Sequence, residues 1–162
     1  MAIYGIGGVS GSGKTYFRST CSGLRESTHV DIADVYERSV AEGRPNLHWK
    51  IALKRFVSIV RDLLLTDKTR DIVLEAFFRP EGLQRKAIER LARECGVDVR
   101  WGWAFASRAE CLRRVSDGGG DDDSPERTKK RLEFIKIADP FFFSERTAES
   151  LQRLTSTLAK TA

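Results

Sequence analysis

The chain has 162 residues, which is the size of one ordinary domain and is enough to bury a core without disulfides or a structural metal. Charged residues make up 31% and hydrophobic residues 41%, and no apolar run approaches the roughly 18 residues that a membrane-spanning helix needs. The net charge of +5 indicates anionic partners, but it does not separate nucleotides from nucleic acid. We predict a single domain over residues 1–162 with no membrane segment. Residues 1–7 lack the features of a secretory signal, so we expect a cytoplasmic protein.

The apolar pattern of the first half predicts alternating strands and helices. Residues 2–6 form a short apolar run that ends in two glycines, which is typical of a buried strand entering a turn. We expect a helix over 14–22, a strand over 29–32 and a helix over 34–41. Apolar residues then recur every three or four positions from Trp49 to Leu64, which predicts the longest helix.

The second half continues the alternation. We predict a central strand over 71–78, a helix over 81–94, a strand over 97–105 and a helix over 108–115. Pro125 suits the first turn of a helix over 126–138. The whole pattern predicts an α/β fold in three layers, a parallel sheet flanked by helices.

The remaining predictions concern a loop, a terminal helix and the cysteines. Residues 116–124, SDGGGDDDS, cannot pack as core and predict a mobile loop, whereas 145–160 has the composition of a polar terminal helix. The cysteines are odd in number and show no CxxC spacing, which argues against a disulfide framework and a zinc site. We therefore expect reduced thiols at Cys21, Cys95 and Cys111.

Residues 8–15, GVSGSGKT, satisfy the phosphate-binding pattern GxxxxGK[ST] between a predicted strand and a predicted helix. Glycines let the backbone N–H groups face inward, and the helix N-terminus adds partial positive charge where phosphates would lie. We expect Lys14 to reach the β and γ phosphates and Thr15 to hold magnesium. The predicted cofactors are thus ATP and Mg²⁺, bound through Gly8, Gly11, Ser12, Gly13, Lys14 and Thr15.

Residues 74–79, LEAFFR, extend this prediction to a second substrate. The segment resembles the IDGFPR motif that ends the third strand of nucleoside monophosphate kinases, the adenylate and UMP/CMP kinases. The resemblance implies a P-loop fold with strand order 2-3-1-4 or 2-3-1-4-5, although no fifth strand is evident after Pro140. It places Glu75 beside the metal with Thr15, Arg79 on the acceptor phosphate and Gln84 near the acceptor base. The same residues would also suit a plain strand-end ion pair.

Residues 110–132 are similar, without gaps, to the lid segment of UMP/CMP kinases. The resemblance implies a lid loop at about 115–126 that closes over the nucleotides, and it implies that Arg114 and Arg131 neutralise the transferring phosphoryl group. One arginine of the family pattern is replaced by Gly120, and Arg113 could compensate. The alternative is a solvated helix end beside an acidic loop.

Residues 30–36, VDIADVY, resemble the family's STGDLLR segment at the start of acceptor-binding helices over about 32–66. The resemblance places Asp34 against the acceptor, while Arg38 follows one position after the expected arginine. The segment is also similar to that of phage polynucleotide kinases, in which an aspartate deprotonates a 5′-hydroxyl. Asp34 or Asp31 could take that role of general base.

Three functions remain open. The leading hypothesis is an ATP- and Mg²⁺-dependent kinase that phosphorylates a nucleoside monophosphate. The second is a kinase that phosphorylates a hydroxyl of a small molecule or of a polynucleotide 5′ end, with nucleic acid then a possible partner. The third is a nucleotide-binding regulator without turnover. The sequence indicates no oligomeric state, and it predicts core packing rather than a site role for His29, His48, Trp49, Trp101 and Trp103.

Overall fold

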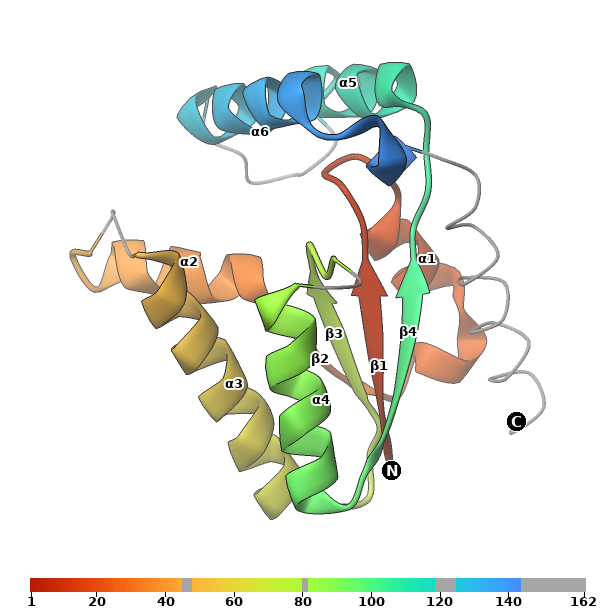
Figure 1. Cartoon of the computed structure of the whole chain (residues 1–162), viewed down its shortest axis with the longest axis vertical. Helices are drawn as coiled ribbons and strands as arrows, with labels where there is room; N and C mark the ends of the chain where they lie inside the picture. The colour runs from red at the N-terminus through yellow and green to blue at the C-terminus, as the bar shows by residue number, and fades with distance from the viewer. Residues whose placement is uncertain (45–47, 80–81, 119–124, 144–162) are drawn as a thin grey trace.

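A four-stranded parallel sheet forms the centre of the molecule (Figure 1). The computed structural model describes residues 1–44, 48–79, 82–118 and 125–143. The strands are β1 (Ala2–Gly7), β2 (Thr28–Asp31), β3 (Ile72–Ala76) and β4 (Asp98–Trp103), in the order β2-β3-β1-β4. This confirms the predicted three-layer parallel fold and its strand order 2-3-1-4. A fifth strand after Pro140 is not tested beyond residue 143, because residues 144–162 lie outside the described part of the chain.

The strand register decides which side chains share a face of the sheet. Asp31 pairs with Glu75, and Ile6 pairs with Glu75 from the other side. Since paired residues of parallel strands point to the same face and alternate residues share it, His29, Asp31 and Glu75 all point to one face. They do so at or near the carboxyl edge of the sheet, where ligands bind in open α/β folds.

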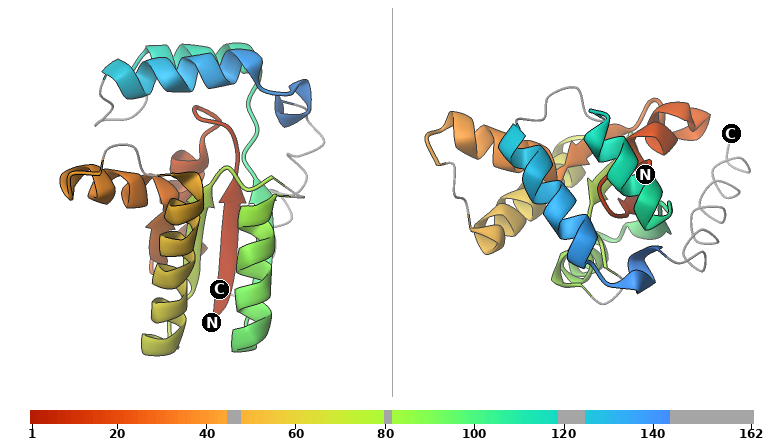
Figure 2. Two further views of the ribbon diagram at one scale, coloured as in Figure 1. Left: turned by 60° about the vertical axis from the view of Figure 1, so that its left-hand side comes forward. Right: turned by 90° about the horizontal axis from the view of Figure 1, so that it is seen from above.

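Two long helices cover the opposite face. Helices α3 (Trp49–Thr66) and α4 (Leu83–Cys95) run side by side there, and Figure 2 shows them packed along the sheet. The buried positions of α3 recur every four residues, which is the spacing that turns one face of a helix toward a core. The core on this face includes Ala52, Phe56, Val60, Leu64, Ile72, Leu74, Ile88 and Leu91. The shorter α1 (Lys14–Thr20), followed by the 3-10 turn η1 (Ser22–Leu24), lies on the other face near Glu75.

A helical pair lies across the carboxyl edge of the sheet. Helices α5 (Arg108–Ser116) and α6 (Pro125–Ile137) pack against each other above the strand ends, and the 3-10 turn η2 (Pro140–Phe143) follows (Figure 1). Val9 and Trp103 belong to the same buried cluster as Cys111 and Ile135 of this pair. The pair therefore packs directly against the segment between β1 and α1, which contains Val9. Helix α2 (Ile32–Ala41) follows β2 at the same edge.

Most predicted elements are present with shifted ends. The first helix stops at Thr20 rather than residue 22, because the chain turns into η1, and α2 begins two residues earlier than expected. The prediction of core packing was wrong for His48 and Trp49: His48 is exposed as the N-cap of α3, and Trp49, which begins α3, is 42% exposed. The three cysteines are free thiols, as expected. Most of the predicted loop and the whole predicted terminal helix, residues 119–124 and 145–160, lie outside the described residues. Among the described helices, none is both long and apolar enough to cross a bilayer.

Candidate functional site

The loop between β1 and α1, residues 8–13, carries the glycines of the phosphate-binding sequence pattern, and we call it the phosphate loop. Part of its backbone has a conformation that only glycine adopts without strain. Gly11 and Gly13 have φ values of 77° and 98°, in the left-handed region that favours glycine. A Cβ atom on Gly11 would also lie 2.7 Å from the carbonyl oxygen of Cys111 in α5. The glycine spacing seen in the sequence therefore serves both the turn and the close packing of α5 on the loop.

Lys14 lies across this loop. Its Nζ donates to the carbonyl oxygens of Gly8 and Val9, at 2.9 and 3.1 Å. Burial lowers the pKa of Lys14 from its usual value, the carboxylates of Glu75 and Asp31 oppose that shift, and the charge of Arg131 adds to it. The ammonium group is thus held at the centre of a charged cluster.

The loop also contains a buried polar atom that lacks a partner. Ser12 Oγ has no hydrogen-bond partner among the described residues, and it lies inside the loop, 2.5 Å from the position that a Cβ on Gly8 would take. A buried hydroxyl without a partner costs free energy unless a ligand or water satisfies it. Together with the glycine backbone and Lys14, this hydroxyl fits a polyphosphate, which would supply acceptor oxygens at this point.

Glu75 connects the loop to the centre of the sheet. Its Oε2 accepts a hydrogen bond from Thr15 Oγ1 at 3.1 Å, and its Oε1 lies 2.9 Å from Arg18 Nε and 3.1 Å from His29 Nε2. The side chain is only 1% exposed. Burial alone would raise the pKa of Glu75, but the contact with His29 and the charges of Arg18 and Lys14 outweigh it, so the pKa lies below its usual value. Thr15 and Glu75 are therefore adjacent oxygen donors, the ligand type that Mg²⁺ prefers.

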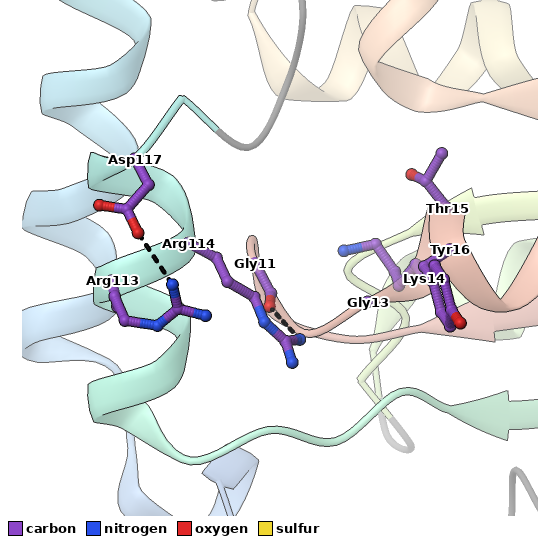
Figure 3. Close-up of a pocket in the computed structure, with 8 residues that line it drawn as sticks. All are labelled: Gly11, Gly13, Lys14, Thr15, Tyr16, Arg113, Arg114 and Asp117. Carbon is purple, nitrogen blue, oxygen red and sulfur yellow. Dashed lines mark hydrogen bonds and ion pairs between the residues drawn. The ribbon is translucent and has the colours of Figure 1, made fainter.

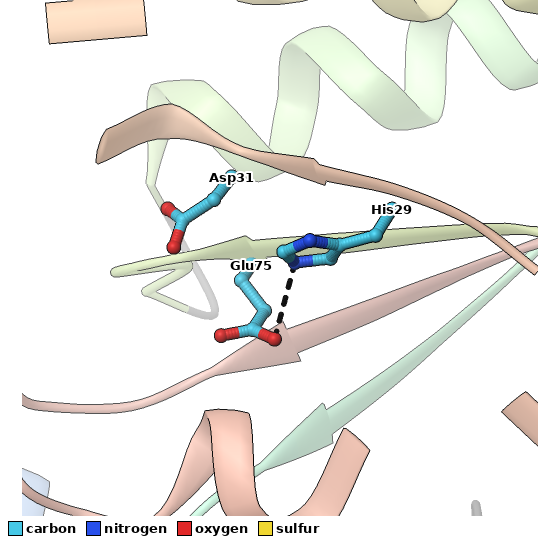
Figure 4. Close-up of side chains that lie close together, drawn as sticks. All are labelled: His29, Asp31 and Glu75. Atoms are coloured by element: carbon cyan, nitrogen blue, oxygen red, sulfur yellow. Dashed lines mark ion pairs between the residues drawn. The ribbon is translucent and has the colours of Figure 1, made fainter. Parts of the chain in front are cut away.

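Asp31 lies next to Glu75 at the end of β2. Figure 4 shows the side chains of His29, Asp31 and Glu75 gathered on the same side of the two strands, and their ligand atoms all lie within 4.8 Å of one another. One oxygen of Asp31 accepts a hydrogen bond from the backbone N–H of Ala33 at 2.8 Å. Burial raises the pKa of Asp31, and the nearby Glu75 carboxylate adds to the rise. Asp31 is thus a half-buried carboxylate beside Lys14 and the loop.

The helical pair brings arginines to the loop from above. Arg114 Nη1 donates to the carbonyl oxygen of Gly11 at 3.1 Å, while its Nε donates to Glu110 Oε1 at 2.6 Å. Arg131, on α6, lies close enough to Lys14 for its charge to lower the lysine pKa. The two arginines that the sequence predicts at the lid thus converge on the phosphate loop. Gly120 lies outside the described residues.

A pocket of about 510 Å³ is lined by residues of both α5 and the loop. Figure 3 shows Arg113, Arg114 and Asp117 on one side and the loop with Lys14 and Thr15 on the other. Arg113 binds both Glu110 and Asp117. The hydrogen bonds that Glu110 accepts from Arg113 and then from Arg114 lower the pKa of Glu110 to about 2. The pocket is lined by the ammonium-bearing Lys14 on one side and by Arg113 and Arg114 on the other, which suits a polyanion.

The residues predicted for the acceptor side are more dispersed. Asp34 and Arg38 are exposed on α2, and Arg79 is exposed just after β3, with its guanidinium 5.3 Å from the ring centre of Phe142. Gln84 is half-buried in the first turn of α4. No hydrogen bond or ion pair joins these four side chains in the described part of the structure. The structure brings Asp31, rather than Asp34, to the phosphate loop.

Sequence reasoning missed two neighbours of Glu75. His29 was predicted as core and Arg18 was not singled out, yet both contact the buried carboxylate. A signal was present for His29, because it lies two positions before Asp31 on a strand and so shares its face. No comparable signal existed for Arg18, which reaches Glu75 from another element.

Comparisons with known proteins identify the fold. No protein-family model matches the chain, and no curated protein matches its sequence. Solved structures do match. APE1195 is 23% identical with a TM-score of 0.62, covering 98% of this chain and 95% of that one. A gluconokinase from Sinorhizobium meliloti is 16% identical with a TM-score of 0.54, covering 99% and 93%.

A third solved structure carries bound ligands. It is the Mycobacterium tuberculosis APS kinase in complex with AMPPNP and APS, 19% identical with a TM-score of 0.54, covering 72% of this chain and 69% of that one. All three identities are below 25%, so the likeness concerns the fold. The chain therefore shares the three-layer α/β fold of these structures, with the glycine pattern of residues 8–15 leading from β1 into α1.

Proposed function

We propose that this protein is an ATP- and Mg²⁺-dependent kinase. The observation that carries the proposal is the joint arrangement at one edge of the sheet: a glycine loop with Lys14 across it, and Thr15 in contact with Glu75. A plain turn between a strand and a helix needs neither a buried ammonium nor a buried carboxylate. Thr15 and Glu75 would hold Mg²⁺, which would neutralise charge on the transferring phosphate.

We further propose that the acceptor is a hydroxyl and that Asp31 is its general base. A hydroxyl must lose its proton as its oxygen bonds to the γ phosphorus, and ADP leaves as the P–O bond to the β phosphate breaks. Asp31 offers a carboxylate oxygen at the carboxyl edge, beside Glu75 and Lys14. Asp34 is exposed and lacks such a position. Gluconokinase and APS kinase, two of the structural matches, are likewise kinases by name.

Arg114 and Arg131 would stabilise the transferring phosphoryl group. Such a group passes through a state with charge spread over three oxygens, so fixed cations around it lower the barrier. Arg114 already contacts the loop through Gly11, and Arg131 acts electrostatically on Lys14. Both arise from α5 and α6, so the position of this helical pair would control access to the site.

A nucleoside monophosphate is the second candidate acceptor. One observation favours it: Arg79 lies three residues after the end of β3 and is exposed, and its guanidinium lies over the ring of Phe142. Stacking leaves the N–H groups of a guanidinium available for a phosphate. An acceptor phosphate is already a nucleophile at neutral pH, so this reaction would not need Asp31.

An acceptor panel separates the candidates. Purified protein, Mg²⁺ and γ-labelled ATP are offered nucleoside monophosphates, sugar acids and a 5′-hydroxyl oligonucleotide, and label transfer is measured for wild type, Asp31→Asn and Arg79→Ala. We expect transfer to a hydroxyl acceptor that Asp31→Asn abolishes and Arg79→Ala reduces only modestly. Transfer to a monophosphate that survives Asp31→Asn contradicts the hydroxyl assignment. ATP binding without transfer to any acceptor would instead favour a nucleotide-binding regulator.

A further inference from the structure

A groove of about 590 Å³ lies between α3 and α4, on the outer surface of the helical layer. Its lining includes apolar side chains, among them Leu53, Val57 and Leu91. Both helices begin at the carboxyl edge of the sheet and run the same way, as Figure 1 shows. We call this feature the α3–α4 groove; one of its ends opens toward the edge that carries the phosphate loop.

The α3–α4 groove is strongly cationic. Among the described residues, five lysines and arginines line it, against one carboxylate, that of Glu94. Lys50, Lys54 and Lys86 are exposed, and none of the three contacts a carboxylate within the described residues. Lys50 and Lys54 are one helical turn apart on α3, whereas Lys86 faces them from α4. An uncompensated row of ammonium groups on both sides of a groove attracts a polyanion.

The two ends of the groove differ. At the end away from the phosphate loop, Arg61 and Arg90 both bind Glu94, each at 3.0 Å, which neutralises part of their charge. At the other end Trp49 is 42% exposed, and Lys50 Nζ lies 5.8 Å from the centre of its ring. The uncompensated charge and the exposed aromatic ring therefore lie together, toward the carboxyl edge.

We propose that the α3–α4 groove binds single-stranded nucleic acid. Single-stranded nucleic acid carries one negative charge per nucleotide, which would pair with the lysines, and its flat bases would stack on the ring of Trp49. An acidic peptide would match the lysines but not the exposed ring beside them. The groove lies outside the pocket of the phosphate loop, so this binding goes beyond the proposed kinase activity and does not depend on which acceptor is phosphorylated.

The test measures binding without nucleotide. Fluorescence anisotropy of a labelled oligothymidine of about 12 nucleotides, within the range that single-strand grooves cover, is followed at several salt concentrations. We expect Lys54→Glu with Lys86→Glu to weaken binding at least about 10-fold and to reduce the salt slope by about 1.4, the value for two lost phosphate contacts on a single strand. Trp49→Ala should weaken binding at least about 5-fold, while Trp49→Phe should retain most of it.

A control variant distinguishes a loss of binding at the groove from an effect of net charge alone. Lys68→Glu with Arg70→Glu makes the same change in net charge between α3 and β3, at the other edge of the sheet, and should leave oligonucleotide binding nearly unchanged. ATP binding of every variant is measured as a check on folding, which also separates this proposal from the kinase proposal. Three results overturn it: an equal loss in the control, no oligonucleotide binding at low salt, or competition by polyglutamate as effective as that by unlabelled oligonucleotide.

Discussion

The phosphate loop and the acceptor side of the site are built differently. At the loop, Lys14 donates to the carbonyl oxygen of Gly8, Thr15 donates to Glu75, and Arg114 of α5 donates to the carbonyl oxygen of Gly11. On the acceptor side, the predicted residues Asp34, Arg38 and Arg79 are exposed and separate, and only Asp31 of the strand end lies near the loop. One region is connected throughout, whereas the other consists of individual side chains around an opening.

The difference shows how much each region depends on sequence neighbours. The loop residues lie within eight positions of one another, so backbone geometry fixes their arrangement. The acceptor side draws on β2, α2, the end of β3 and α4, so its geometry depends on how these elements pack. Substitutions should therefore have large, uniform effects at the loop and acceptor-dependent effects on the other side.

Lys14→Ala should have the largest effect. We expect phosphoryl transfer to fall by more than about 1000-fold, because the variant removes the one ammonium group at the phosphates. Initial rates of label transfer from ATP measure it, with Lys68→Ala, an exposed lysine outside the site, as the control. Retention of transfer within 10-fold of wild type would remove the loop from the mechanism.

Asp31→Asn and Asp34→Asn together test which aspartate is the general base. We expect Asp31→Asn to lower the rate with a hydroxyl acceptor at least about 100-fold, as for loss of a general base, and Asp34→Asn to change it by only a few-fold. Both variants should bind ATP as wild type does. Equal losses in the two variants, or a larger loss for Asp34→Asn, would show that the base was assigned to the wrong aspartate.

Glu75→Gln tests the buried charge cluster. Because the pKa of Glu75 lies below its usual value, its ionised form stabilises the folded state at pH values above the pKa of the unfolded chain. We expect the variant to lose about 3 kcal/mol at pH 7 in Mg²⁺-free buffer, a loss that shrinks as pH falls below roughly 4.5. Urea titrations at several pH values measure it, and Glu42→Gln, which removes an exposed ion pair with Arg55, should cost less than about 1 kcal/mol.

Asp31 should show the opposite sign in the same titrations. Burial raises its pKa in the folded state, so its ionised form opposes folding as pH rises above the usual aspartate pKa. Asp31→Asn should therefore be more stable than wild type at pH 7, with no gain below roughly pH 4. A loss of stability at pH 7 would mean that the carboxylate is better stabilised than its surroundings indicate.

Gly11→Ala and Gly43→Ala should have the smallest effects of the variants considered, and these effects are on the free energy of unfolding. Both glycines have left-handed φ values, 77° and 75°, but only Gly11 is crowded by α5. Gly43→Ala should cost about 1 kcal/mol for its backbone alone, and Gly11→Ala about 1 to 2 kcal/mol more. Thermal unfolding compares the two. Equal costs would mean that α5 does not rest on the loop as closely as the structure shows.

The sequence predicted the sheet and the loop because both rest on local patterns. Apolar runs gave the strands, and the glycine spacing with Lys14 and Thr15 gave the position of the turn between β1 and α1. It could not predict that Arg18 contacts Glu75, since that contact joins α1 to β3, whereas the position of His29 two residues before Asp31 was a signal that we missed. Nor could it place Trp49, whose spacing fits the buried face of α3 although the first three residues of that helix are exposed.

The central claim is that the glycine loop, with Lys14 across it, binds the polyphosphate of ATP. Isothermal titration calorimetry of ATP and adenosine, each with Mg²⁺, into wild type and Lys14→Ala tests it directly. We predict that wild type binds ATP and that both adenosine and the Lys14→Ala variant show affinity at least about 10-fold weaker, since phosphates supply most of the contacts. Adenosine binding as tight as that of ATP, or a Lys14→Ala variant with wild-type affinity, would contradict the account.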